Sequence, residues 1–213
     1  MNNTVRAVMD RLNDNRIDAY FVENREQLLL LLRRLIQEGE TVAVGGSVTL
    51  EETGVLEHLR SGRYNFLDRY AKGLDRAAIE EIFRRSFYAD TYLTSANAVT
   101  MNGELFNVDG NGNRVNAITF GPTSVIVICG TNKIVPDLEA AVKRVKTIAA
   151  PLNAKRLNKA TPCAASGHCL KVDGCMTDGC NSVDRICSAY VVTGRQIKKG
   201  RIKVVLIDGD FGY

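Results

Sequence analysis

Two short apolar runs constrain the fold more than any other feature of the sequence. Residues 41–45 read TVAVG and residues 125–129 read VIVIC, without the alternation of apolar and polar positions that a half-exposed strand shows. Strands of this kind are typical of parallel sheets that are buried on both faces. Helical periodicity precedes them in residues 1–15, where Val5 and Leu12 belong to an apolar stripe. The sequence therefore predicts an α/β fold, a three-layer sandwich with a mainly parallel sheet.

The rest of the chain continues this alternation up to residue 150. Further helices are expected at residues 24–37, 75–87 and 136–149, and further strands at residues 17–22, 64–67 and 89–94. Residues 158–187 then form a cysteine-rich excursion without a clear period. Residues 189–193 and 202–207 read as two strands that close the fold as an antiparallel hairpin. Because the chain has 213 residues and 45% hydrophobic content, we expect a single domain over residues 1–213.

Composition and charge narrow the classes of partner. The net charge is only +4, and no stretch concentrates Lys and Arg with interleaved aromatic residues, so we expect no nucleic-acid partner. No apolar run approaches the ~20 residues needed to span a bilayer, so we expect no membrane partner either. The first fifteen residues lack the apolar region of a secretion signal, which predicts a cytoplasmic protein. A homo-oligomer stays open.

The first candidate site is the glycine turn in residues 45–54, GGSVTLEETG, directly after an apolar strand. Thr49 and Glu52 have the spacing of a capping box, which predicts a helix start whose free N–H groups attract an anion. The turn lacks the Lys of a Walker loop and is not G-x-G-x-x-G, which argues against a polyphosphate site. Glu52 could act on a substrate as a base or as a carboxylate nucleophile. The alternative is a plain capped helix start.

The second candidate site lies in residues 95–133, where short apolar runs alternate with Asn, Gly and Asp. This pattern is typical of tight turns between short strands, and loops on a rigid scaffold often carry function. Asp109 precedes Gly110 in such a turn, and near Arg114 or Lys133 its carboxylate could serve as a general base or bind a sugar hydroxyl. The alternative is Asx-turn chemistry, in which these side chains bond their own backbone. An EF-hand calcium loop is excluded because no Glu occupies its twelfth position.

The third candidate site is a crowd of cysteines near the end of the chain. They are Cys163, Cys169, Cys175, Cys180 and Cys187. In a cytoplasmic protein such a group indicates metal or redox chemistry before disulfides, and thiolates suit zinc or an iron–sulfur centre. No pair has the C-x-x-C spacing of a zinc ribbon, and free thiols or reversible disulfides are the alternative. Cys129 lies in an apolar run and is expected to be a buried small hydrophobe.

Several uncommon strings, taken together, resemble the LUD domain, the lactate-utilisation protein family. They are GGSVTLEETG (45–54), ADTYLTSANAVTMNGELFNVDGNGNRV (89–115), GPTSVIVICGTNKIV (121–135), AAPLNAKRL (149–157), TPCAASGHC (161–169), DRICSAYVV (184–192) and the final VLIDGDFGY. The resemblance implies a fold similar to the ribose-5-phosphate isomerase, glucosamine-6-phosphate deaminase and CoA-transferase superfamily. In those enzymes a glycine-Ser/Thr loop holds phosphate and an Asp-Gly turn carries active-site groups. GGSVT and Asp109-Gly110 look like their counterparts.

The same resemblance implies a role beside the oxidation of L-lactate to pyruvate, alongside iron–sulfur and redox partner proteins. Cysteine-tailed members of the family usually show C-x5-C-x2-C-x6-C. The four positions of this cysteine pattern are matched by Cys163, Cys169, Cys180 and Cys187 if residues 170–179 carry an insertion. That insertion brings Cys175, which could replace Cys180 as the third ligand of an iron–sulfur cluster or of zinc.

These patterns together predict one pocket at the ends of the parallel strands, where α/β sheets place ligands. Its candidate catalytic residues are Glu52 and Asp109, and its candidate ligand-binding residues are Gly46, Ser47, Thr49, Asn97, Asn107, Gly110, Asn113, Arg114, Asn132 and Lys133. The expected function is in organic-acid metabolism, with a small anionic metabolite, a carboxylate or a sugar phosphate, as the ligand. The rivals are an iron–sulfur electron-transfer or accessory protein that works through its cysteines, and an enzyme similar to sugar-phosphate isomerases or CoA-transferases. Whether the protein is an enzyme stays open.

Overall fold

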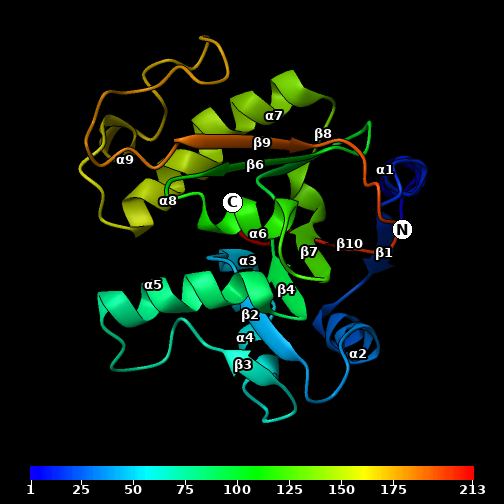
Figure 1. Cartoon of the computed structure of the whole chain (residues 1–213). Helices are drawn as coiled ribbons and strands as arrows, with labels where there is room; N and C mark the ends of the chain where they lie inside the picture. The colour runs from blue at the N-terminus through cyan, green and yellow to red at the C-terminus, as the bar shows by residue number, and fades with distance from the viewer.

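A six-stranded sheet forms the centre of the molecule in this computed structural model, which describes residues 1–213 (Figure 1). Its strand order is β1-β10-β7-β4-β2-β3, and all five pairings are parallel. The strands are β1 (Asp18–Val22), β2 (Thr41–Val44), β3 (Asn65–Leu67), β4 (Thr91–Thr94), β7 (Ser124–Gly130) and β10 (Ile202–Ile207). The predicted α/β fold with a mainly parallel sheet is confirmed.

Helices cover both faces of this sheet. In chain order, the α-helices of the molecule are α1 (Asn3–Asp14), α2 (Arg25–Leu35), α3 (Val48–Glu52), α4 (Val55–Leu59), α5 (Arg76–Arg85), α6 (Asn113–Thr119), α7 (Leu138–Arg144), α8 (Ala150–Arg156) and α9 (Pro162–Ser166). Alternate residues of β7 belong to different cores. Val125 and Val127 pack in the core that includes α1 and α6, whereas Ile126 and Ile128 pack in the core that includes α2, α3 and α4. The sheet is therefore buried on both sides, which confirms the three-layer sandwich.

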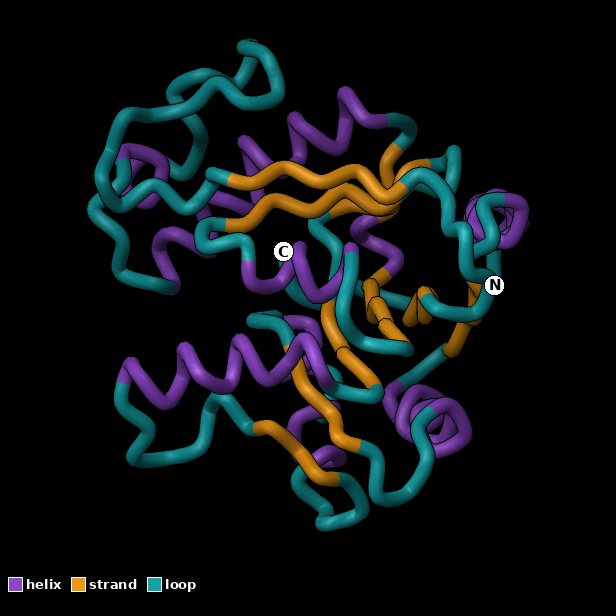
Figure 2. Tube along the Cα trace, in the orientation of Figure 1, coloured by secondary structure: helices purple, strands orange, loops and turns teal.

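A second sheet of four strands, in the order β8-β5-β6-β9, lies above the first in the view of Figure 2. Its strands are β5 (Ala98–Thr100), β6 (Leu105–Asp109), β8 (Ile134–Val135) and β9 (Ala189–Thr193). Neighbouring residues of β6 pack on opposite sides: Leu105 joins the core shared with α1, whereas Phe106 packs in a third core with residues of α7. The segment 95–133 therefore spans both sheets, and its turns lie where the sheets meet.

The predicted closing hairpin is wrong. β9 pairs antiparallel with β6 in the small sheet, whereas β10 lies between β1 and β7 in the large sheet. Residues 194–201 therefore cross from one sheet to the other. The physical reason is burial, since every residue of β10 except Lys203 is buried. A strand that is apolar on both faces is most stable at the centre of a parallel sheet.

The predicted cysteine-rich excursion, residues 158–187, contains only α9 as regular structure and otherwise consists of turns and loops. A π-helical turn, Val145–Ala149, joins α7 to α8. Within it the Lys146 carbonyl accepts a hydrogen bond from Cys169 N at 2.8 Å, which ties the excursion to the helix. Single π-turns of this kind often lie at functional sites. None of the helices combines the length and the apolar character needed to cross a membrane.

Candidate functional site

A cavity of about 390 Å³ lies beside the ends of β2, β4 and β6 and against α8. Nine of the twelve predicted site residues line it: Gly46, Ser47, Thr49, Asn97, Asp109, Gly110, Asn113, Arg114 and Lys133. The other three, Glu52, Asn107 and Asn132, do not. The structure therefore brings two turns to one cavity. The glycine turn follows β2 of the large parallel sheet, and the Asp-Gly turn follows β6 of the small sheet, so the cavity lies where the two sheets meet.

The glycine turn after β2 brings the backbone close to the neighbouring strand. A Cβ on Gly45 would lie 2.9 Å from Thr94 Oγ1, so only glycine fits there without a shift. The helix that follows, α3, has only five residues, and its N-cap is Ser47. The predicted Thr49 capping box is wrong because the helix begins two residues earlier than the spacing indicates. The Thr49 side chain is instead buried and contacts Lys133.

Lys133 is the buried cation of the cavity, with an exposed fraction of only 2%. Its Nζ donates hydrogen bonds to Thr49 Oγ1 at 2.8 Å and to Ser95 Oγ at 3.0 Å. It takes part in none of the eight salt bridges of the structure. Burial, with smaller contributions from the charges of Arg144 and Arg114, lowers the pKa of Lys133 to about 8. Because an ammonium group has three donors, one of them is left without a protein acceptor.

Arg114 connects the strand ends around the cavity through neutral acceptors. Its guanidinium donates to the carbonyls of Ser95 and Val108 and to the side-chain oxygens of Asn97 and Asn107. Asn107 is fully buried and lies outside the cavity, and its Oδ1 accepts from Arg114 at 2.7 Å. The structure therefore places Asn107 behind Arg114, where it positions the guanidinium instead of touching a ligand.

Asp109 lines the cavity, but its carboxylate is engaged by backbone N–H groups. Oδ1 accepts from Gly110 N at 2.8 Å, while Oδ2 accepts from Arg114 N at 2.9 Å and from Val115 N at 3.2 Å. The last two donors belong to the first turn of α6, where a carboxylate stabilises unpaired N–H groups. These contacts correspond to the Asx-turn alternative and hold the carboxylate in place at the cavity wall.

Glu52 and Asn132, which lie outside the cavity, hold one backbone segment. Glu52 Oε2 accepts a hydrogen bond from Gly212 N at 2.6 Å, and Asn132 Nδ2 donates to the Gly212 carbonyl at 3.3 Å. This segment places Tyr213 on the cavity wall, with its hydroxyl buried and without a hydrogen-bond partner. Burial also raises the pKa of Tyr213. The structure thus assigns Glu52 and Asn132 to positioning the wall.

Sequence reasoning missed much of the positive charge of the cavity. Six lining residues are cationic and two are acidic, namely Arg69, Arg114, Lys133, Arg156, Lys159 and Arg185 against Asp109 and Asp184. Lys159 pairs with Asp184 at 3.5 Å, whereas Arg69 and Arg156 form no salt bridge with a carboxylate. Arg69 stacks on Phe83, with 4.4 Å between its Cζ and the ring centroid. No sequence pattern marks Arg69, whereas Arg156 and Arg185 lie in the strings 149–157 and 184–192, which carry the family resemblance without indicating a role for these cations.

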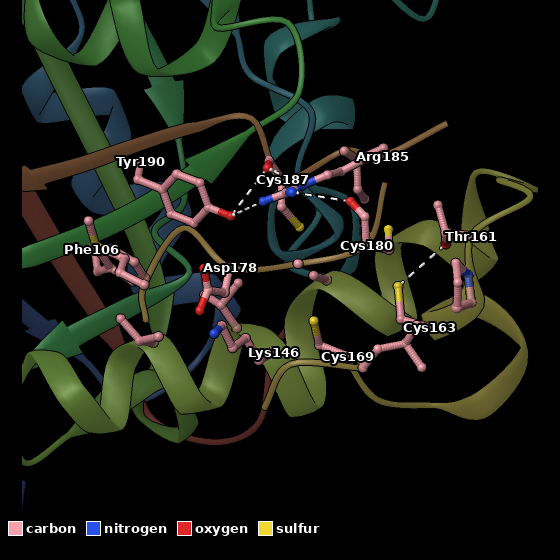
Figure 3. Close-up of a pocket in the computed structure, with 18 residues that line it drawn as sticks. Phe106, Lys146, Thr161, Cys163, Cys169, Asp178, Cys180, Arg185, Cys187 and Tyr190 are labelled. Atoms are coloured by element: carbon pink, nitrogen blue, oxygen red, sulfur yellow. Dashed lines mark hydrogen bonds between the residues drawn. The ribbon is translucent and has the colours of Figure 1, made fainter. Parts of the chain in front are cut away.

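Four of the cysteines line a second, smaller cavity of about 30 Å³ (Figure 3). They are Cys163, Cys169, Cys180 and Cys187. Cys175 is exposed and lies outside this cavity, and Cys129 is fully buried in β7 as predicted. All six thiols are free, and no group of three or more His, Cys, Asp or Glu side chains is close enough to hold a metal ion. Burial raises the pKa of Cys187 to about 11, with the neighbouring thiols adding to this shift.

Comparison with protein families identifies the chain. The family model of the LUD domain matches residues 5–207, a range that includes both cavities except for Tyr213. The chain belongs to the LUD domain family. The resemblance seen in the sequence strings is therefore confirmed over nearly the whole chain. No curated protein matches the sequence.

Solved structures show what this LUD domain is similar to. A DUF162 family protein from Deinococcus radiodurans is 14% identical with a TM-score of 0.53, over 97% of this chain and 96% of that chain, which indicates a shared fold. The eIF2B beta protein from Chaetomium thermophilum is 19% identical with a TM-score of 0.37, over 53% and 43% of the two chains. A ribose 5-phosphate isomerase from Plasmodium falciparum is 12% identical with a TM-score of 0.33, over 53% and 52%. The last two matches cover about half of the chain and establish no function.

Proposed function

We propose that this LUD-family protein binds a small anionic metabolite, a carboxylate or a sugar phosphate, in the cavity beside Lys133, and that it acts in organic-acid metabolism linked to lactate utilisation. The observation that carries this proposal is the environment of Lys133. Lys133 is 2% exposed and lines the cavity, and its ammonium group forms no salt bridge with a carboxylate. A ligand oxygen would supply both the missing acceptor and the missing negative charge.

The energetic argument starts from the cost of burying charge. Removing an ammonium group from water costs several kcal/mol after relaxation, and this cost is usually offset by an ion pair. The hydroxyls of Thr49 and Ser95 solvate Lys133 only in part, because they carry no net charge. An anion in the cavity would complete this solvation, and its binding would stabilise the folded protein.

The other side chains of the cavity fit the same ligand class. Arg69 and Arg156 lack carboxylate partners and provide guanidinium donors, which suit carboxylate and phosphate oxygens. Ser47, Asn113 and further polar groups on the wall could bind hydroxyl groups of the ligand. A volume of about 390 Å³ falls in the lower part of the ~300–1,000 Å³ range typical of small-molecule sites. These features favour a compact metabolite over a dinucleotide.

An enzyme similar to sugar-phosphate isomerases or CoA-transferases needs a group that transfers a proton or attacks a carbonyl. Glu52 lies outside the cavity, and the Asp109 carboxylate accepts three N–H hydrogen bonds. Lys133 therefore replaces them as the candidate acid–base group, because a pKa of about 8 places its titration near physiological pH. The binding proposal does not depend on catalysis.

The test is calorimetric titration with L-lactate, pyruvate, ribose 5-phosphate and inorganic phosphate at low salt. The wild-type protein, Lys133→Met and Lys198→Met are compared, since Lys198 is exposed and does not line the cavity. We expect at least one anion to bind the wild type and K198M equally, and to bind K133M at least 100-fold more weakly, the effect of about 3 kcal/mol from a charge-assisted hydrogen bond. Equal affinity in K133M would overturn the proposal, as would the absence of binding by every anion tested.

A further inference from the structure

The smaller cavity is built by four cysteines that are widely separated along an irregular segment. We infer that Cys163, Cys169, Cys180 and Cys187 bind one thiophilic metal centre, either zinc or an iron–sulfur cluster, and that this centre holds the wall it shares with the anion cavity. The role of the shared wall rests on the proposed function, whereas the metal site itself does not.

The convergence of the thiols is the first observation. Cys163 lies in α9, Cys169 and Cys180 lie in loops, and Cys187 lies just before β9, yet all four side chains face one cavity (Figure 3). Four thiolates are a ligand set that zinc and iron–sulfur clusters prefer over other metals. The exposed Cys175 is excluded from this set by its position, which makes Cys180 the third ligand.

No three of these thiols are grouped closely enough to hold a metal ion, so metal binding requires them to move toward one another. A cavity of about 30 Å³ has room for a water-sized occupant, so a single ion needs less rearrangement of the loop than a larger cluster does. The four sulfurs lie on loops and a five-residue helix, where side-chain rotation and small backbone shifts meet little resistance.

The second observation is that two cationic side chains donate hydrogen bonds to backbone carbonyls of the cysteine-rich segment, residues 158–187. Lys146 is 5% exposed, and its Nζ donates to the carbonyls of Lys171, Gly174 and Cys175. Arg185 donates to three further loop carbonyls and to a tyrosine hydroxyl. Both line the small cavity, and neither forms a salt bridge.

The charges explain why these cations matter. Four thiolates around a divalent metal carry a net charge of about −2, and the same holds for a common four-iron cluster. Lys146 and Arg185 would offset this charge at short range, which makes the burial of Lys146 without a carboxylate favourable. Asp178, the acidic residue on the wall, is turned to the backbone and accepts from Cys175 N at 2.9 Å.

The length of the irregular segment, residues 167–188, also supports a metal centre. Irregular loops longer than about 12–15 residues are uncommon inside a compact domain unless they carry a function. Residues 167–188 contain no helix or strand, and none of them is buried. A segment without an apolar core of its own can be organised by a metal, whose binding free energy then contributes to folding.

The two cavities share a wall, so the metal centre would act on the anion site. Val145, Ala150, Arg185, Ile186 and Cys187 line both of them. The carbonyl of Asp109 accepts a hydrogen bond from Ser188 N at 2.9 Å, which fixes the cysteine loop directly to the Asp-Gly turn. Loss of the metal should therefore loosen one side of the anion cavity and weaken anion binding.

The first test measures metal, acid-labile sulfide and the visible spectrum of anaerobically purified wild-type protein, together with Cys163→Ser, Cys180→Ser, Cys187→Ser and the matched control Cys175→Ser. We expect roughly one zinc per chain without sulfide, or iron with a similar amount of sulfide and visible absorbance. The metal should be lost from the three site variants and retained in C175S. Metal-free wild-type protein would overturn the proposal, as would retention in C187S or an equal loss in C175S.

A second measurement keeps the proposal testable if a site variant misfolds, and it separates the two proposals. Hydrogen exchange of the wild type with and without a chelator should show lost protection in residues 158–187 and unchanged protection in the central strands. Chelation should also weaken anion binding at least several-fold, while K133M should retain its full metal content. If no anion binds but the metal is present, only the proposed function and the shared-wall role fail. If anions bind and no metal is found, only the metal site fails.

Discussion

Replacing Lys133 by Met should stabilise the folded protein, and the gain should depend on pH. The pKa of Lys133 falls from 10.5 to about 8 on folding, chiefly through burial. One pKa unit corresponds to about 1.36 kcal/mol, so a fall of about 2.5 units corresponds to a cost of roughly 3 kcal/mol while the ammonium group stays protonated. Thr49 and Ser95 keep other acceptors, since their hydroxyls also donate to the carbonyls of Phe211 and Ala96. K133M therefore removes the cost without leaving a buried hydroxyl unsatisfied.

The sign of the pH effect follows from proton binding. Between pH 8 and 10.5 the unfolded chain keeps a proton on Lys133 that the folded protein has lost, so the stability of the wild type rises with pH in this window. The advantage of K133M should be about 3 kcal/mol at pH 7 and should shrink by about 2 kcal/mol at pH 9.5. The assay is urea unfolding of both proteins at several pH values, analysed as a difference so that other groups cancel. A K133M protein that is less stable than the wild type at pH 7, or a difference that is constant with pH, would refute the reasoning.

Two further predictions concern the wall of the cavity. Gly45→Ala should destabilise the fold by about 1–3 kcal/mol because its Cβ would lie 2.9 Å from Thr94 Oγ1, whereas Gly46→Ala should be tolerated because its Cβ would meet only the flexible end of a side chain at 3.5 Å. Thermal unfolding of the two variants checks this, and equal stabilities would contradict it. Glu52→Ala should raise hydrogen exchange in residues 209–213, since it removes the acceptor of Gly212 N. Unchanged protection of that segment would show that Glu52 does not hold it.

The central strands of the sheet could be predicted from the sequence because a strand that is buried on both faces leaves a continuous apolar run in the sequence. The apolar runs of β2 and β7 have no polar alternation, and both are central strands buried on two faces. The position of β10 between β1 and β7 could not be predicted in this way. Its apolar run is equally compatible with a hairpin and with a parallel neighbour, and only the gap between β1 and β7, formed by residues far apart in the chain, decides between them.

The location of the site was predictable, but the roles of its residues were not. Nine of the twelve predicted residues line one cavity, although the Asp-Gly turn reaches it from the end of β6 in the small sheet and not from a parallel strand. Roles depend on which N–H or carbonyl group each side chain reaches in three dimensions. Asp109 reaches the first turn of α6, and Glu52 reaches Gly212, 160 residues away, so neither role has a local signal. The cations Arg69 and Arg156 likewise enter the cavity from segments whose local patterns indicate no contact with a ligand.

The central claim is that the positive charge of Lys133 binds an anion, and one titration tests it directly. The anion that binds the wild type most tightly is titrated calorimetrically at pH 7 and at pH 9.5 into the wild type and K133M. The account predicts that wild-type affinity falls by at least tenfold at pH 9.5, because the ammonium group with a pKa of about 8 has lost its charge there, and that K133M is weak at both pH values. Wild-type affinity that is independent of pH, together with equal affinity in K133M, would contradict it.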